Sequence, residues 1–97
     1  MLHCIAEPSL TLPVVERIVV GDDVVLMSES VWAAYAGHRD NTLLHALLQK
    51  PCRVFAMRDL LQAFGMAESQ LLPTVRAIDY DVLVELTVQH PQIHTWC

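Results

Sequence analysis

Short runs of apolar residues alternate along this chain with segments whose apolar side chains recur every three or four residues. Strands are expected over residues 1–6, 23–27, 53–57 and 74–78, and the second contains an unbroken Val-Val-Leu-Met. Continuous apolar runs of this length are typical of strands covered on both faces, as in parallel sheets. The alternation therefore predicts an α/β fold, with a small parallel sheet of about four strands and helices on both faces.

The segments between the expected strands carry helix start and stop signals. Helices are expected between Thr11 and Gly21, from Ser28 or Ser30 through Tyr35, and over residues 42–49, 60–64 and 80–89. Thr11, Asn41 and Asp79 are placed as N-caps, whereas residues 92–97 follow Pro91 as a tail. The only glycines, Gly21, Gly37 and Gly65, each fall at a helix end. No glycine-rich loop is left to cradle a phosphate, so no nucleotide or other cofactor is expected.

The chain carries more apolar side chains than a domain of its size can bury. It has 97 residues, which indicates a single domain over residues 1–97, and 54% of them are hydrophobic against 18% charged. A domain of this length buries only about 60 to 70% of the surface of its unfolded chain. We therefore expect the surplus apolar side chains to face other protein subunits.

Membrane insertion and nucleic-acid binding are both disfavoured. A spanning helix needs about 20 consecutive apolar residues, and the longest apolar stretches here are interrupted by charged residues such as Glu16 and Asp22. The first seven residues have no basic segment typical of a signal peptide, so the protein is expected to be cytoplasmic. The net charge of −5 argues against direct nucleic-acid contact, which normally needs a basic face.

Three cysteines, an odd number without a C-x-x-C pair, are expected to be reduced thiols. Cys4 lies in the middle of the first expected strand, on the face opposite His3, and is predicted to be a buried core residue. Cys52 stands beside Arg53, where a neighbouring cation would lower the pKa of the thiol. Cys97 is the most accessible of the three. Cys52 and Cys97 are the candidates for a reactive thiol, and incidental positions are the favoured interpretation of both.

The other polar candidates have structural interpretations that we favour. His90, His94 and Cys97 follow an H-x3-H-x2-C spacing similar to that of metal ligands, but Pro91 separates the histidines and no fourth ligand is evident, so no metal is expected. The remaining polar candidates are acids and serines at the ends of expected elements. Asp22 and Asp23 are predicted to form a solvated turn, Asp79 and Asp81 to suit a helix start, and Ser28 and Ser30 to cap a helix.

Three aromatic residues, Trp32, Tyr35 and Trp96, are candidates for anchoring a protein interface. Trp and Tyr often dominate the binding energy of such interfaces. Trp32 lies on a short apolar helix, so a core position suits it equally well. No constellation of residues in the chain indicates an enzyme active site.

The C-terminal part of the chain resembles a known family. Residues 78–91 read I-D-Y-D-V-L-V-E-L-T-V-Q-H-P, with Trp96 five residues on, and the TusB branch of the DsrH family ends in a similar I-D-Y, V-x-L-T-x-x-H-P and W pattern. Weaker agreement runs through the rest of the chain: the Met-Leu-His start, Gly21-Asp22 before an apolar strand, Ala33-Ala34, the stretch V-F-A-M at 54–57, Asp59-Leu60 and Gly65.

This resemblance implies a compact parallel α/β fold and a place in a sulfur-relay complex. TusB-like proteins assemble with TusC-like and TusD-like subunits as a heterohexamer. That complex accepts sulfur from TusA and passes it through TusE toward the enzyme that thiolates the wobble uridine of tRNA. In the family the carrier cysteine belongs to the TusD-like subunit, so the resemblance implies a non-catalytic subunit here.

Some DsrH proteins of sulfur-oxidising bacteria carry a cysteine in the first helix, whereas residues 9–20 of this chain contain none. This difference favours the tRNA branch and a structural role. Two alternatives stay open. In the first, the chain is a thiol sulfur carrier, or a DsrH-like protein of sulfur oxidation, and uses Cys97 or Cys52. In the second, the chain is a self-associating structural domain.

Overall fold

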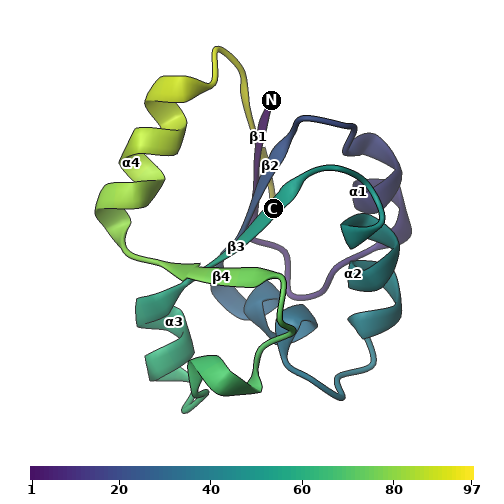
Figure 1. Ribbon diagram of the computed structural model, residues 1–97, viewed down its shortest axis with the longest axis vertical. Helices are drawn as coiled ribbons and strands as arrows, with labels where there is room; N and C mark the ends of the chain where they lie inside the picture. Colours follow the sequence, from purple (N-terminus) through teal and green to yellow (C-terminus); the bar gives the residue numbers. More distant parts are fainter.

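Five parallel strands form one sheet in the computed structural model, which describes residues 1–97 (Figure 1). The strands are β1 (Leu2–Ile5), β2 (Asp23–Leu26), β3 (Arg53–Met57), β4 (Val75–Ile78) and β5 (Ile93–Trp96), and their order in the sheet is β4-β3-β2-β1-β5. The predicted α/β class and parallel sheet are confirmed, and the four expected strands are all present.

The fifth strand corrects the sequence prediction, which placed a tail at residues 92–97. Strand β5 pairs in parallel with β1, with Leu2 opposite Ile93 and Ile5 opposite Trp96. Most of its side chains are exposed. The strand therefore lacks the unbroken apolar run that marks β2 in the sequence, and backbone pairing at the sheet edge defines it instead.

Helices cover both faces of the sheet, as predicted, but unequally. The helical elements are α1 (Leu12–Arg17), the 3-10 helix η1 (Ser28–Ala34), α2 (Asn41–Leu48), α3 (Arg58–Ala63), the 3-10 helix η2 (Glu68–Gln70) and α4 (Tyr80–Gln89). Three successive one-strand steps in the same direction place α1, α2 and α3 on one face, because such crossovers are right-handed. The connection from β4 to β5 runs back across the sheet, so α4 lies on the side opposite α1 and α2 (Figure 1).

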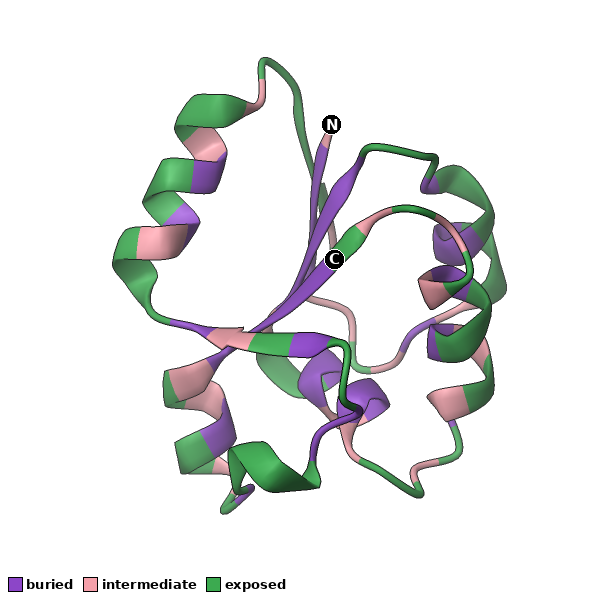
Figure 2. Cartoon of the chain, in the orientation of Figure 1, coloured by how far each residue is buried: buried purple, intermediate pink, exposed green.

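Two hydrophobic clusters follow from this arrangement. The larger cluster packs side chains of α1, η1 and α2 against one sheet face, and the smaller lies between the other face and Leu83 and Leu86 of α4. Figure 2 shows β1, β2 and most of β3 buried and the outer sides of the helices exposed. No helix has both the length and the apolar character needed to cross a bilayer.

The predicted helix ends and caps are confirmed in part. Helix α4 spans the predicted residues, with Asp79 at its N-cap position. Helix α1 ends at Arg17 rather than near Gly21, because Ile18 is extended and fully buried. Asn41 is the first residue of α2 rather than its cap, and its side-chain amide donates to the carbonyl oxygens of Ala33 and Tyr35.

The serines at the carboxyl end of β2 do not cap a helix as predicted. Ser28 has a φ of +56° and begins the 3-10 helix η1. Ser30 is buried, and its hydroxyl donates to the carbonyl oxygens of Ile5 at 2.7 Å and Met27 at 2.6 Å. These bonds tie η1 to the ends of β1 and β2, which is a structural role of a different kind.

Candidate functional site

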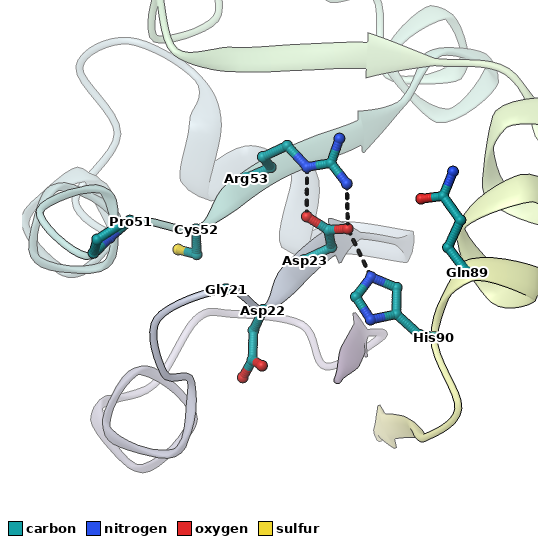
Figure 3. Close-up of a pocket in the computed structure, with 8 residues that line it drawn as sticks. All are labelled: Gly21, Asp22, Asp23, Pro51, Cys52, Arg53, Gln89 and His90. Atoms are coloured by element: carbon teal, nitrogen blue, oxygen red, sulfur yellow. Dashed lines mark hydrogen bonds and ion pairs between the residues drawn. The ribbon is translucent and has the colours of Figure 1, made fainter.

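A polar cleft of about 320 Å³ lies at the amino ends of β2 and β3 (Figure 3). Its walls come from the turns that precede the two strands and from the carboxyl end of α4. The lining residues are Gly21, Asp22, Asp23, Pro51, Cys52, Arg53, Gln89 and His90. Neighbouring parallel strands begin at the same edge of a sheet, so residues distant in sequence converge there.

Asp23 is the centre of the cleft. It pairs in register with Arg53, whose guanidinium donates from Nε to Oδ1 at 2.7 Å and from Nη2 to Oδ2 at 2.6 Å. His90, at the end of α4, contacts Oδ2 through Nε2 at 2.7 Å (Figure 3). Burial alone would raise the pKa of the Asp23 carboxyl, but the hydrogen bonds from Arg53 and His90 outweigh it and lower the pKa. Asp23 therefore joins β2, β3 and α4 through one carboxylate.

Asp22 points away from Asp23, Arg53 and His90 (Figure 3) and is bound to a second set of donors. Its carboxylate accepts from the Val19 amide at 3.1 Å, from the N-terminal ammonium group at 3.0 Å and from His3 Nε2 at 2.9 Å. Burial would raise the pKa of Asp22, and these three donors together lower it. His3, which the sequence reasoning singled out only by its face, is fully enclosed by this contact and by Trp96 of β5.

These contacts overturn the prediction that Asp22 and Asp23 form a solvated turn. Both residues are buried, with exposed fractions of 6% and 2%. The reason is the position of β2, which has β1 on one side and β3 on the other. The start of a central strand is enclosed by its neighbours, and a buried carboxylate there needs hydrogen-bond donors.

The structure also corrects the expected electrostatics of Cys52. The thiol is half-buried at the cleft and lies 3.5 Å from the carbonyl oxygen of Leu47. Burial raises its pKa, the charges of Asp22 and Asp23 raise it further, and Lys50 opposes them. Arg53 does not activate the thiol, because its guanidinium is bound to Asp23.

The other two thiols occupy different surroundings. Cys4 is buried in the cluster beneath α4, as predicted, and burial raises its pKa. Cys97 is exposed at the end of β5. The structure does not bring the three cysteines together, and only Cys52 lines the cleft.

The proposed array of His90, His94 and Cys97 is not assembled into a metal site. His90 is bound to Asp23, whereas His94 lies on β5 against Trp96, with ring centroids 4.4 Å apart. No group of three or more His, Cys, Asp or Glu side chains is placed to hold a metal ion. The physical reason is that Pro91 ends α4 and the following residues enter the sheet.

The aromatic interface candidates are all partly packed within the chain. Trp32 contacts Tyr35 and Phe64, with ring centroids 5.4 and 5.8 Å apart. Trp96 lies beside His3 on the α1 side of the sheet. Each keeps some exposed surface, so their role at an interface stays a prediction.

The polar side chains at the cleft mainly hold elements of the fold together. Asp23 is bound to Arg53 and His90, whereas Asp22 is bound to His3 and the N-terminal ammonium group. No buried side-chain nitrogen or oxygen lacks a partner. The only nucleophile on its wall is Cys52, a thiol whose pKa is raised. Sequence reasoning missed the link between Asp23, Arg53 and His90, and the charged residues at two strand starts were the only local signal for it.

Solved structures with the same fold were found at low sequence identity. The crystal structure of the ychN protein from Escherichia coli superposes with a TM-score of 0.79 at 14% identity, covering 98% of this chain and 97% of that one. The protein of unknown function MTH1491 from Methanobacterium thermoautotrophicum gives a TM-score of 0.76 at 18% identity, covering 97% and 95%. These similarities establish the fold alone.

Sequence comparison goes further than the fold. Residues 9–93 match the family model described as DsrH like protein. Protein TusB of Pectobacterium parmentieri is 40% identical over 76 residues, which is 78% of this chain and 76% of that protein. Protein TusB of Escherichia coli strain K12 is 36% identical over the same length and the same shares of both chains. The chain therefore belongs to the DsrH family.

Proposed function

We propose that this protein is a structural subunit of a hetero-oligomeric sulfur-relay complex of the TusBCD type, which supports 2-thiolation of the wobble uridine in tRNA. The observation that carries the proposal is the match to the DsrH family over residues 9–93, together with similarity to TusB proteins over most of the chain. Family membership supports a role related to sulfur relay, and the tRNA branch is the more specific proposal.

A structural role rather than a sulfur-carrying one agrees with the state of the thiols. A carrier cysteine needs an exposed thiol of lowered pKa, because the thiolate is the nucleophile. Cys4 is buried, and the pKa of Cys52 is raised by burial and by the two aspartates beside it. Arg53 and His90 are bound to Asp23, and only Lys50 acts to lower the pKa of the Cys52 thiol.

The proposed partners are TusC-like and TusD-like subunits in a heterohexamer, with TusA and TusE as donor and acceptor of the whole complex. Exposed apolar side chains support a need for partners. They are Leu12, Val19, Val20, Tyr80, Val84, Val88 and Ile93. The acidic net charge of −5 supports a position away from the tRNA itself, and we propose that the complex works in the cytoplasm.

Complementation of a deletion strain tests the proposal. The gene is deleted, and thiolated wobble uridine is measured by mass spectrometry of digested tRNA. We expect thiolation to be lost and to return with the wild-type chain. It should return equally with a variant carrying Cys4→Ala, Cys52→Ser and Cys97→Ser. Unchanged thiolation in the deletion strain contradicts the relay role, and failure of the variant in an assembled complex contradicts the structural role.

A second candidate function is sulfur carriage by this chain itself. The observation in its favour is that Cys52 lines the cleft, while Cys97 is exposed. Incubation with a cysteine desulfurase, cysteine and TusA, followed by mass spectrometry, distinguishes the two candidates. A mass increase of one sulfur atom on Cys52 or Cys97 supports the carrier role, and an unmodified chain supports the structural one.

A further inference from the structure

The outer side of α4 carries an apolar row beside an acidic row. Tyr80, Val84 and Val88 follow one another at four-residue spacing and are 71%, 43% and 81% exposed. Asp81 and Glu85 are exposed at the same spacing. Four residues of an α-helix advance the side chain by about 40° beyond a full turn, so each set forms one gently slanted row. The two rows run side by side along the helix.

This apolar row does nothing for the fold of the chain itself. Leu83 and Leu86 make the contacts of α4 with the sheet, and the row lies on the side turned away from them. In Figure 2 the inner side of α4 is buried and its outer side is exposed. No other helix lies against the outer side of α4 (Figure 1), so the row has no helix beside it within the chain.

The choice of residues adds a second argument. Valine is among the weaker helix formers, because its branched side chain loses rotamer freedom against the preceding turn. At an exposed helix position it gains no packing that would offset this loss. Val84 and Val88 therefore weaken α4 in the isolated chain. Burial against another molecule would supply the missing gain.

The charge of α4 identifies the kind of molecule. The helix contains two acids and neither Lys nor Arg, and the whole chain has a net charge of −5. Two copies paired antiparallel about a two-fold axis would place both acidic rows on the same side of the contact. Like charges facing each other oppose association. A second copy of this chain is therefore disfavoured as the binding partner. A partner with an apolar surface and basic side chains complements both the apolar row and the acidic row of α4.

We propose that the outer face of α4, formed by Tyr80, Val84 and Val88 with Asp81 and Glu85, is the docking surface for a different protein chain. The partner presents an apolar groove with Lys or Arg side chains along one side. The proposal rests on the proposed function in that the partner is a companion subunit of the relay complex. It adds which face of this subunit makes the contact.

Matched double variants test the surface. The variant Val84→Gln/Val88→Gln removes the apolar row while introducing better helix formers. The control Thr42→Gln/Ala46→Gln introduces two glutamines at the same four-residue spacing, at exposed positions of α2. Glu85→Lys reverses one charge of the acidic row. Thermal unfolding of each variant establishes that it is folded. Binding to the purified TusC-like and TusD-like subunits from the same organism is then measured by interferometry at low and high salt.

We expect the α4 double variant to bind at least about tenfold more weakly, because truncation of central apolar contacts has effects of this order. The control should bind like wild type. Glu85→Lys should weaken binding at low salt and reduce its salt dependence, since screening acts on the complementary charges. If the α4 variant binds as tightly as wild type, or if the control loses binding to the same extent, the proposed docking surface is wrong. Neither result contradicts the proposed relay function.

Three further outcomes bear on the docking surface. If the wild-type chain binds neither companion, the proposed function fails together with the docking surface. Sedimentation velocity of the chain alone tests whether a second copy of the chain binds this surface. A homodimer that the α4 variant dissociates overturns the proposal of a basic partner. A monomer that binds its companions through α4 supports it.

Discussion

Trp96 donates a hydrogen bond from its indole Nε1 to Nδ1 of His3, at 3.2 Å, between the last strand of the chain and the first. An indole N–H can only donate, so Nδ1 of His3 carries no proton. The proton of the neutral ring is then on Nε2, which donates to Asp22 Oδ2 at 2.9 Å. One imidazole, 1% exposed, thus links β5 to the start of β2 in a single tautomer.

Removing the indole donor tests how β5 is held. Trp96→Phe keeps an aromatic ring but leaves the buried Nδ1 of His3 without a partner. We expect a loss of about 1 to 2 kcal/mol in the free energy of unfolding, as for a buried hydrogen bond with one partner removed. Amide hydrogen exchange in Ile93–Trp96 should accelerate. Trp32→Phe is the matched control, since no hydrogen bond of the Trp32 indole is lost, and equal exchange in β5 for both variants would contradict the linkage.

The carboxylate of Asp23 is expected to be a main support of the cleft. Asp23→Asn removes the charge that Arg53 and His90 share. We expect a destabilisation of about 2 to 3 kcal/mol in urea unfolding, in the range for hydrogen bonds to charged groups. Glu16→Gln, an exposed acid in α1, should change stability by less than about 0.5 kcal/mol. Equal effects of the two substitutions would show that the contacts with Asp23 add nothing to stability.

Stability should fall in acid because of the two aspartates. The folded state lowers the pKa of both Asp22 and Asp23 below the ordinary value of 3.8. Their contribution is therefore fully present above that value and is lost as the pH falls through the lower folded-state pKa. The free energy of unfolding, measured from pH 7 to pH 2, should decline most steeply below about pH 4. The double variant Asp22→Asn/Asp23→Asn should show a shallower decline, and an unchanged slope would refute the assignment.

The thiol of Cys52 should react as an unactivated cysteine. Its pKa is raised above the ordinary value of 9.0 by burial and by Asp22 and Asp23. The rate of alkylation at Cys52, followed by peptide mass spectrometry, should therefore reach half its maximum above pH 9.0. Lys50→Gln should shift this midpoint upward, because Lys50 opposes the rise, and Asp22→Asn should shift it downward. A wild-type midpoint below 9.0 would favour the sulfur-carrier alternative.

Much of the fold was predictable because its signals are local. The apolar residues of β2 and β3 indicate strands covered on both faces. Asp79, followed by Leu83 and Leu86 at helical spacing, indicates the start of α4. Strand alternation placed Cys4 and His3 on opposite faces. Each of these inferences uses residues a few positions apart, whose relation is set by the geometry of one strand or one helix.

The candidate site was hidden from such reasoning because it depends on strand order and register. Asp23 lies beside Arg53 only because β2 pairs with β3 in that register, and His90 reaches them only because α4 runs back across the sheet. β5 likewise carries no apolar pattern and exists through pairing with β1. Local patterns in the chain specify strands β1 to β4 and helix α4, since their periodicity involves residues a few positions apart. The tertiary structure alone decided that Asp22 and Asp23 are buried and paired, because burial at a central strand requires neighbours that no local pattern specifies.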